Sequence, residues 1–287
     1  MDRLGRYIGL AIILGCAEPG DEVLSDRILF EGEGVVRATS IDGLQRFIVP
    51  TGPDLSGAYT PAVSPDGRRI AFSGIRLGQV DLYVMHADGT GRRQLTNDAG
   101  LEFYPRWSPD GSSLLFTWNP TPNNPPTLMV IMDPNGRNRR DVLTDGWAGD
   151  WSPDGRSIAF TGTGARGRGI YVLDIGGGTV TSLPDVCGSI CEGIAPRWSP
   201  DGQYLAFTYL RPVGGNSVVL ARPNGADART LLPEWETFSP VWAPDGQRLA
   251  LARFESSARM YLVSLATMET VSLSPAEANE FPSDWAP

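Results

Sequence analysis

The sequence predicts an all-β fold built from repeated four-stranded units, and three observations carry this prediction. Ser-Pro-Asp-Gly starts at residues 64, 108, 152 and 199, and Ala-Pro-Asp-Gly starts at residue 243, so successive copies lie 44, 44, 47 and 44 residues apart. A short apolar stretch follows each copy, for example residues 70–72 and 205–207. The C-terminal residues 284–287 repeat only the first half of the unit. A fixed period of this size is typical of solenoids and β-propellers.

The repeated motif has the residues of a tight hairpin turn. Pro fixes φ at about −65° at the second turn position, Asp tolerates the next one, and Gly takes the left-handed position after it. The turn joins an inner strand that ends in Trp107, Trp151, Trp198 or Trp242, with Val63 in the first copy, to the apolar second strand. A third strand at residues 81–85 and a short fourth strand at 93–96 complete the first unit. Four antiparallel strands in about 44 residues make one propeller blade.

The two ends of the sequence predict the number of blades. Residues 26–30 match the second half of the unit, and residues 284–287 match its first half. We therefore expect a composite last blade, with its inner strand from the C-terminus and its outer three strands from residues 27–50. Five complete repeats and this shared blade predict a six-bladed β-propeller over residues 26–287. Such closure removes the open sheet edges that promote aggregation.

The N-terminus has the features of an export signal. Arg3 and Arg6 precede an apolar stretch at residues 7–15, which is too short to span a bilayer. Residues 13–16, Ile-Leu-Gly-Cys, resemble a bacterial lipobox, which implies a signal peptide at 1–16, lipidation of Cys16 and a linker at 17–25. An ordinary signal peptide that contains a Cys is the alternative. Ala17 favours the outer membrane by analogy with enterobacterial sorting, so we expect an exported, lipid-anchored protein.

Cys187 and Cys191 lie four residues apart in a Gly-containing stretch. In an exported protein this pair predicts a disulfide. The closed loop is small, so such a bond would stabilise mainly its own loop.

Residues 105–116 and 196–207 follow the pattern Pro-x-Trp-Ser-Pro-Asp-Gly with an apolar second strand that ends in Phe. This pattern resembles the repeat of the TolB propeller and of the propeller in prolyl oligopeptidase-type enzymes. The resemblance extends over nearly all of residues 26–287. TolB carries an α/β domain before its propeller and the peptidases carry a hydrolase domain, and we expect neither here. What the resemblance implies is therefore the fold and not the partner. We expect a monomeric propeller.

Composition argues against several classes of function. The formal net charge is −9 and the cationic residues are all Arg, so nucleic acid is an unfavourable partner by overall charge. The absence of Lys excludes Schiff-base chemistry and the lysine of a phosphate-binding loop. His86 is the only His, aligns with Asp133 and Asp174 at strand ends, and is read as a turn residue. We expect no catalytic residues, no metal site and no cofactor.

Candidate binding residues gather where the inner strands begin. Five of the six residues four positions before the Trp position are aromatic, and we expect them to form a ring near the channel entrance. This aromatic ring, with Ile194 as its sixth member, consists of Tyr59, Phe103, Trp147, Phe238 and Phe281. Tyr104 follows Phe103 and is counted with this group. The ring either packs between blades or forms an apolar collar for a peptide or protein segment.

The position directly before the Trp position carries charges. Arg106, Asp150, Arg197 and Asp284 occupy it in four of the repeats. The first three alternate in sign over neighbouring repeats. These residues form either internal salt bridges along the channel or a polar site for a charged terminus.

Two readings of function remain open from the sequence. The first is a lipid-anchored, non-catalytic module of the bacterial envelope, TolB-like in fold, that binds a protein or peptide. The second is a propeller hydrolase or lyase that acts on a glycan or peptide in the central funnel. The second reading requires clustered carboxylates or a bound metal there, among residues such as Glu102, Asp150, Glu280 and Asp284.

Overall fold

The computed structural model is all-β in the residues that it describes, which are 24, 26–32, 34–121, 127–164, 167–183, 192–211, 215–275 and 278–287. The expected lipidation site Cys16 and the expected disulfide between Cys187 and Cys191 lie outside these residues. Within the described ranges, no helix is long and apolar enough to cross a membrane.

Groups of four strands, here called blades, repeat along the chain. The first blade after the N-terminal strands contains β4 (Gly57–Val63), β5 (Arg69–Arg76), β6 (Gln79–His86) and β7 (Arg93–Gln94). The next contains β8 (Leu101–Trp107), β9 (Leu114–Asn119), β10 (Leu128–Met132) and β11 (Arg140–Thr144). A single parallel pair, Val80 with Leu101, joins these two blades into one eight-stranded sheet.

The later blades are separate four-stranded sheets. They are β12 (Gly146–Trp151), β13 (Ser157–Gly164), β14 (Gly167–Asp174) and β15 (Val180–Ser182); β16 (Glu192–Trp198), β17 (Leu205–Leu210), β18 (Ser217–Ala221) and β19 (Arg229–Thr230); and β20 (Thr237–Trp242), β21 (Arg248–Phe254), β22 (Ala258–Ser264) and β23 (Thr270–Ser272). The expected third strand at 81–85 lies within β6, and the expected fourth strand at 93–96 is reduced to β7.

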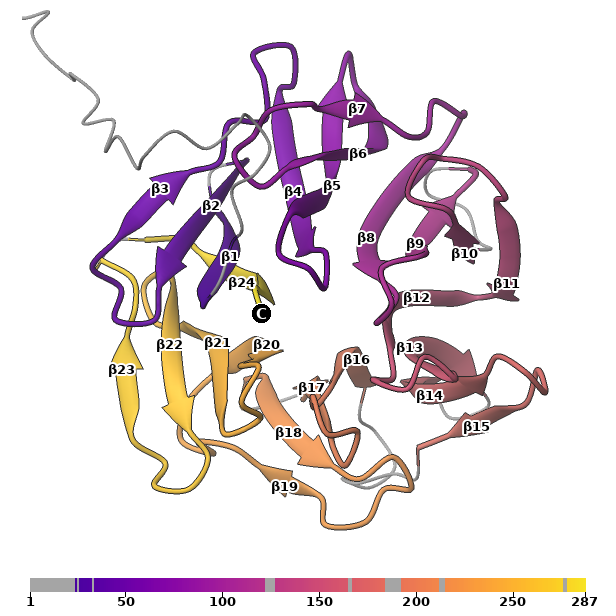
Figure 1. Ribbon diagram of the computed structural model, residues 1–287. Helices are drawn as coiled ribbons and strands as arrows, with labels where there is room; N and C mark the ends of the chain where they lie inside the picture. The colour runs from indigo at the N-terminus through magenta and orange to yellow at the C-terminus, as the bar shows by residue number, and fades with distance from the viewer. Residues whose placement is uncertain are drawn as a thin grey trace, which may run out of the picture.

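The two ends of the chain meet in one sheet. Its order is β24 (Phe281–Trp285), β1 (Arg27–Gly32), β2 (Val35–Ser40) and β3 (Arg46–Ile48). β24 pairs antiparallel with β1, with Trp285 opposite Ile28. The sheets are arranged around a central axis, with β4, β8, β12, β16, β20 and β24 nearest to it and the C-terminus close to the centre (Figure 1).

The hairpin turns have the geometry that the sequence predicts. The turn glycines, including Gly67 at φ 70° and Gly155 at φ 70°, occupy the left-handed region, where a side chain is disfavoured. The backbone N–H of Gly67 donates to the carbonyl of Ser64 at 2.8 Å, which closes the turn. Asp66 contributes as well, because its carboxylate accepts a hydrogen bond from the Ser64 hydroxyl at 2.5 Å.

The hydrophobic core lies between neighbouring blades. One cluster joins Ala71 and Leu82 of the β4–β7 blade to Leu114 and Phe116 of the β8–β11 blade. Another joins Phe30 and Trp285 of the end-to-end sheet to apolar residues of the β20–β23 blade. Burial of these faces drives the association of the blades and fixes the inner strands around the axis.

Candidate functional site

A β-bulge interrupts each of the inner strands β4, β8, β12, β16 and β20. The pairing register shifts just after the aromatic position, for example between Phe103 and Arg106. The residue that follows the aromatic position has a positive φ of 48–57° in all five strands: Thr60, Tyr104, Ala148, Ala195 and Ser239. A bulge of this kind bends a strand and redirects its side chains. Here it turns the aromatic position and the charged position toward the axis.

Hydroxyl groups on the neighbouring blade bind the N–H groups that the bulges leave unpaired. The backbone N–H of Ala148 donates to Thr117 Oγ1 at 3.0 Å, and that of Ala195 donates to Thr161 Oγ1 at 2.9 Å. Ser239 donates in the same way to Thr208 Oγ1 at 3.0 Å. These threonines share one position, directly after the Phe of each second strand, which we call the hydroxyl position.

A cavity of about 330 Å³ opens at the channel end where the inner strands begin. Its lining includes Tyr104, Trp147, Ile194, Phe238 and Phe281. Tyr59 and Phe103 are half-buried like the other members of the aromatic ring, but they do not line this cavity. The volume lies at the lower end of the range for small-ligand pockets.

The rings at this mouth contact one another across blade boundaries. The Phe238 and Phe281 ring centroids lie 5.5 Å apart, and those of Tyr104 and Trp147 lie 6.2 Å apart. These separations are favourable for aromatic pairs. The rings are therefore packed against each other and still border the open cavity.

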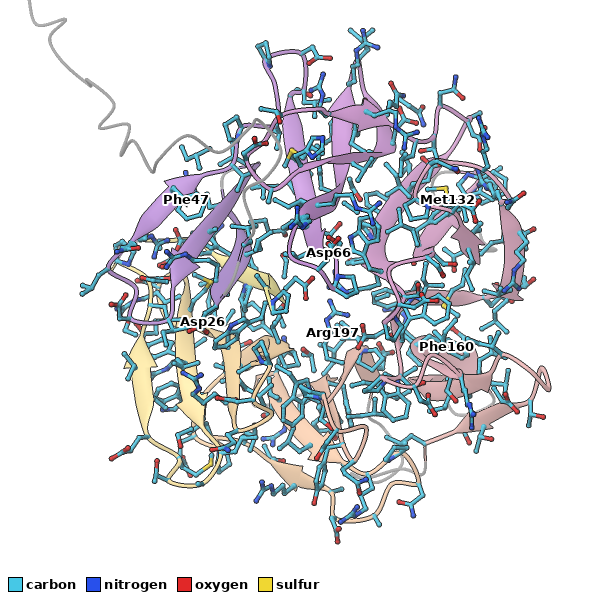
Figure 2. All side chains as sticks on the ribbon, in the orientation of Figure 1. Asp26, Phe47, Asp66, Met132, Phe160 and Arg197 are labelled. Atoms are coloured by element: carbon cyan, nitrogen blue, oxygen red, sulfur yellow. The ribbon has the colours of Figure 1, made fainter. Side chains whose placement is uncertain are left out.

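The charged residues before the Trp position interact with one another inside the channel. Nε of Arg106 lies 4.0 Å from Oδ1 of Asp150. Oδ2 of Asp150 accepts a hydrogen bond from the N–H of Trp198 at 2.8 Å, and Oδ2 of Asp284 accepts one from the N–H of Val63 at 2.7 Å. Figure 2 shows Arg197 beside the central axis, where these four residues form what we call the channel floor.

Burial shifts the protonation equilibria of the channel floor. Desolvation raises the pKa of Asp150 and of Asp284, and the two arginines oppose that rise. Desolvation and the charge of Arg106 lower the pKa of Arg197 to about 10. Arg197 still carries its charge at neutral pH, so the two aspartates serve as counter-ions within the floor.

A second cavity of about 270 Å³ lies on the other side of the floor, at the end with the Ser-Pro-Asp-Gly turns. Asp150, Asp284 and Arg197 line it, together with prolines such as Pro65 and Pro200. Arg197 borders both cavities. The mouth cavity is thus lined by aromatic rings and arginines, whereas the second cavity has two carboxylates.

Glu31 is a residue of the mouth cavity that the sequence analysis missed. It follows Phe30 and therefore occupies the hydroxyl position, where the other blades carry Ser73, Thr117, Thr161, Thr208 and Ala252. Oε2 of Glu31 accepts a hydrogen bond from the N–H of Thr60 at 2.7 Å, as the threonines do elsewhere. An alignment of the repeats on this position would have revealed the unusual carboxylate. Desolvation raises the pKa of Glu31, while the Thr60 N–H and Arg106 oppose the rise.

The carboxylates that the enzyme reading requires do not cluster in the funnel. Glu102 is fully buried and Glu280 is 4% exposed, and neither lines a cavity at the channel. Glu280 is instead bonded to Arg46 and to the Ser274 hydroxyl. Of the four carboxylates named for the enzyme reading, Asp150 and Asp284 border a channel cavity together, and Glu102 and Glu280 do not.

His86 lies at a strand end, directly before a turn. It is the last residue of β6, and its backbone N–H donates to the carbonyl of Thr90 at 2.9 Å. Among the described residues, no group of three or more His, Cys, Asp or Glu side chains is arranged to hold a metal ion.

The comparisons with known proteins agree with this architecture. A family model described as the TolB beta propeller domain matches residues 32–125. The Tol-Pal system protein TolB of Anaeromyxobacter dehalogenans is 46% identical over 50 residues, which cover 17% of this chain and 12% of that protein. The chain therefore matches only a small part of that relative's length.

Solved structures match over most of the chain. The crystal structure of TolB from Acinetobacter baumannii has a TM-score of 0.75 at 24% identity, covering 91% of this chain and 66% of that one. An oligogalacturonate lyase from Vibrio parahaemolyticus has a TM-score of 0.57 at 15% identity, covering 88% and 73% of the two chains. These likenesses show the fold. Together with the family match, they show that the fold of this chain is similar to the TolB β-propeller.

Proposed function

We propose that this protein is a non-catalytic binding propeller of the bacterial cell envelope, which captures a segment of a protein or peptide at the aromatic mouth. The observation that carries the proposal is the cavity bordered by Tyr104, Trp147, Phe238 and Phe281 above a floor of paired charges. Aromatic side chains in a partly desolvated pocket are the usual anchors of protein–protein binding. The likeness to TolB, named as a protein of the Tol-Pal system, supports an envelope partner.

The channel floor supports a binding role more than a catalytic one. Asp150 and Asp284 each accept a backbone N–H and face an arginine, so both carboxylates already have structural partners. A general acid or base needs an oxygen within hydrogen-bond reach of its substrate.

A hydrolase or lyase acting on a glycan or peptide is the second candidate. Asp150 and Asp284 border the second cavity together, which brings two carboxylates into one pocket. The likeness to an oligogalacturonate lyase concerns the fold. Incubation with oligogalacturonates and with short peptides, followed by mass spectrometry, tests this candidate. Turnover that Asp150→Asn abolishes would replace the binding proposal.

We further propose that the chain closes as a ring of six blades and is held at a membrane by a lipid on Cys16. The backbone N–H of Leu24 donates to the carbonyl of Gly67 at 2.8 Å, so the chain enters the propeller at the face of the Ser-Pro-Asp-Gly turns. The eight residues that follow Cys16, up to Leu24, can span at most about 29 Å, so a lipid on Cys16 would lie close to this face. This proposal directs the turn face toward the membrane and the aromatic mouth away from it. We also propose that the protein is exported, that its membrane is the outer membrane, and that the propeller is monomeric.

The test is an affinity capture from detergent-solubilised envelopes with the wild-type lipidated protein and a Trp147→Ala/Phe238→Ala variant. The matched control replaces exposed apolar residues of the outermost strands, Ile48 and Val271, by Ala. The proposal expects a partner that the control retains and the mouth variant loses, with both variants folded by circular dichroism. Equal capture by all three proteins would refute binding at the mouth.

A further inference from the structure

The two carboxylate oxygens of Glu31 have different surroundings. Oε2 replaces the threonine hydroxyl of the other blades by accepting the N–H of Thr60 at 2.7 Å. Oε1 has no hydrogen-bond partner among the described residues, and the half-buried side chain lines the mouth cavity. A threonine would be sufficient for the structural contact, as Thr161 demonstrates with Ala195. The carboxylate therefore adds an acceptor and a negative charge that the fold does not require.

The pseudo-symmetry of the propeller supports this distinction. Pro282 occupies the bulge position of β24 and has no N–H, and the residue at the facing hydroxyl position is Ala252, which has no acceptor. Thr117, Thr161 and Thr208 thus provide an acceptor where the next blade has a donor, and Ala252 provides none where Pro282 has none. At the remaining position the N–H of Tyr104 is bound by Thr60 Oγ1, at 3.3 Å, instead of by Ser73. Glu31 departs from this pattern because it has a second carboxylate oxygen and a negative charge, and the N–H of Thr60 needs only one acceptor.

Glu31 shares its nearby cation, Arg106, with Asp150 of the channel floor. Arg106 donates from its two Nη atoms to the carbonyls of Pro105 and Ser283, at 3.0 and 2.9 Å, and its Nε faces Asp150. The charge of Arg197 is balanced within the floor by Asp150 and Asp284. Arg106 and Arg197 thus face three carboxylates. Two of these, Asp150 and Asp284, belong to the floor, and the third is Glu31 in the wall of the mouth cavity.

The wall next to Glu31 is aromatic. Tyr104, Trp147, Phe238 and Phe281 line the same cavity, and Phe281 is the direct cross-strand neighbour of Glu31. Cations are attracted to the faces of aromatic rings, and this attraction increases when the site excludes water. A carboxylate oxygen beside aromatic rings is suited to a positively charged group with an apolar body.

Because only Oε1 of Glu31 is free, the site favours one kind of cation over another. A guanidinium group binds a carboxylate best through both oxygens at once, but Oε2 of Glu31 is already engaged by Thr60. A primary ammonium is a compact charge that is satisfied by one carboxylate oxygen and by ring faces.

We propose that the mouth cavity binds a primary ammonium group carried by an apolar group, with Glu31 Oε1 as its acceptor and the aromatic rings around its body. An N-terminal amine or a lysine side chain of a polypeptide supplies this chemistry. The inference deepens the proposed function, since it rests on the same mouth and specifies what the partner presents there.

Protonation of Glu31 competes with the ligand. The groups that face Glu31 are the Thr60 N–H, Arg106 and the Tyr104 hydroxyl, and its cross-strand neighbours Val36 and Phe281 are apolar. Desolvation raises the pKa of Glu31 in the free protein, and a bound cation lowers it. Affinity for an ammonium therefore falls as the pH falls through the pKa of Glu31 in the free protein.

The test compares three probes of similar size that differ in charge: phenethylamine, phenethyl alcohol and 3-phenylpropionate. Their affinities are measured by calorimetry and saturation-transfer NMR for the wild type, Glu31→Thr and the charge-matched control Glu192→Gln. Glu192 is 46% exposed and pairs with Arg168, so its replacement removes the same charge outside the cavity lining. The wild type and the control should prefer the amine over the alcohol by about tenfold, and Glu31→Thr should lose that preference.

Peptides then distinguish the two sources of the amine. One amidated peptide has a free N-terminus and no Lys, a second is acetylated with an internal Lys, and a third is acetylated with norleucine in place of Lys. Binding of the first or second that is lost in Glu31→Thr supports the proposal. Glu31→Gln, which retains an acceptor for Thr60, repeats the comparison if the threonine variant is unstable.

Several outcomes would overturn the inference. These are a preference for 3-phenylpropionate, equal binding of the amine and the alcohol, no binding of any probe, and an unchanged amine affinity in Glu31→Thr. The envelope capture distinguishes a failure of the ammonium site from a failure of the proposed binding function. A partner lost by Trp147→Ala/Phe238→Ala but retained by Glu31→Thr would leave the binding role intact and remove the ammonium site.

Discussion

The carboxylate of Asp284 accepts a hydrogen bond of 2.7 Å from the backbone N–H of Val63, which lies 221 residues earlier in the chain. Asp150 makes the same contact with the N–H of Trp198, at 2.8 Å, between two other inner strands. Each aspartate thereby links neighbouring inner strands and balances the charge of Arg106 and Arg197. The contact of Asp284 joins the last strand of the chain to its first full repeat.

We expect Asp284→Ala to lower the free energy of unfolding by about 3–5 kcal/mol, because it leaves buried arginine charge uncompensated. Asp284→Asn should cost less, about 1–2 kcal/mol, since its amide oxygen can still accept the Val63 N–H. Urea denaturation followed by tryptophan fluorescence measures both. Asp227→Ala is the control, because Asp227 is 60% exposed and pairs with Arg222, which makes a loss below about 1 kcal/mol the expectation. Equal losses for Asp284→Ala and Asp227→Ala would contradict this account.

Thr161→Val should destabilise the propeller by about 1–3 kcal/mol, because the valine has the shape of threonine but cannot accept the N–H of Ala195. Thr161→Ser retains the hydroxyl and should recover most of that loss. Thr163 lies two residues along the same strand and is exposed, so Thr163→Val serves as the control and should be nearly neutral. Thermal unfolding of the four proteins gives the comparison, and a Thr161→Val protein as stable as wild type would show that water satisfies this N–H.

The sequence could predict the strands and turns because each repeat encodes them locally. The Pro and Gly of the turn motif determine the hairpin, and the left-handed φ of Gly67 follows directly from them. The bulges are different, because they depend on pairing between strands and place ordinary residues such as Ala148 at positive φ. A bulge also changes which side chains share a face. It brings Phe281 and Asp284 to the channel while Glu280 turns into the protein, which strict alternation could not predict.

The position of Glu31 at the mouth could not be predicted from the sequence for a related reason. Its strand comes from the incomplete repeat at the N-terminal end of the described chain, so the comparison of full repeats did not include it. Only the pairing of β1 with β24 places Glu31 beside Phe281 at the mouth. The charged residues Arg106 and Arg197 were easier to predict, because they sit at a fixed distance from the Trp position.

The lipid anchor gives a prediction at the N-terminus. Cys16→Ser should abolish incorporation of radiolabelled palmitate and move the protein from the membrane pellet to the supernatant after ultracentrifugation, because a single residue supplies the acylation site. Cys187→Ser is the control and should remain in the pellet. Palmitate labelling that persists in Cys16→Ser would exclude this residue as the anchor.

Glu102 and Glu280 occupy the same position of the repeat, five residues before Trp107 and Trp285, but their environments differ. Glu280 is bonded to Arg46 and accepts a hydrogen bond from the Ser274 hydroxyl at 2.7 Å. Both oxygens of Glu102 are buried and have no hydrogen-bond partner in the described part of the chain. Desolvation, together with the nearby charge of Asp81, raises the pKa of Glu102 to about 8.

Glu102→Gln should therefore stabilise the protein in alkaline solution. The pKa of Glu102 is higher in the folded state than in the unfolded state, so the folded state binds more protons between about pH 4.5 and 8, and stability falls as the pH rises through that window. At pH 9 the variant should exceed the wild type by about 3–5 kcal/mol in urea denaturation, whereas at pH 4 the two should be nearly equal. Glu280→Gln should be less stable than wild type at pH 9, because it removes the partner of Arg46. If Glu102→Gln were instead destabilising at pH 9, the carboxylate would have a cationic partner that offsets its burial.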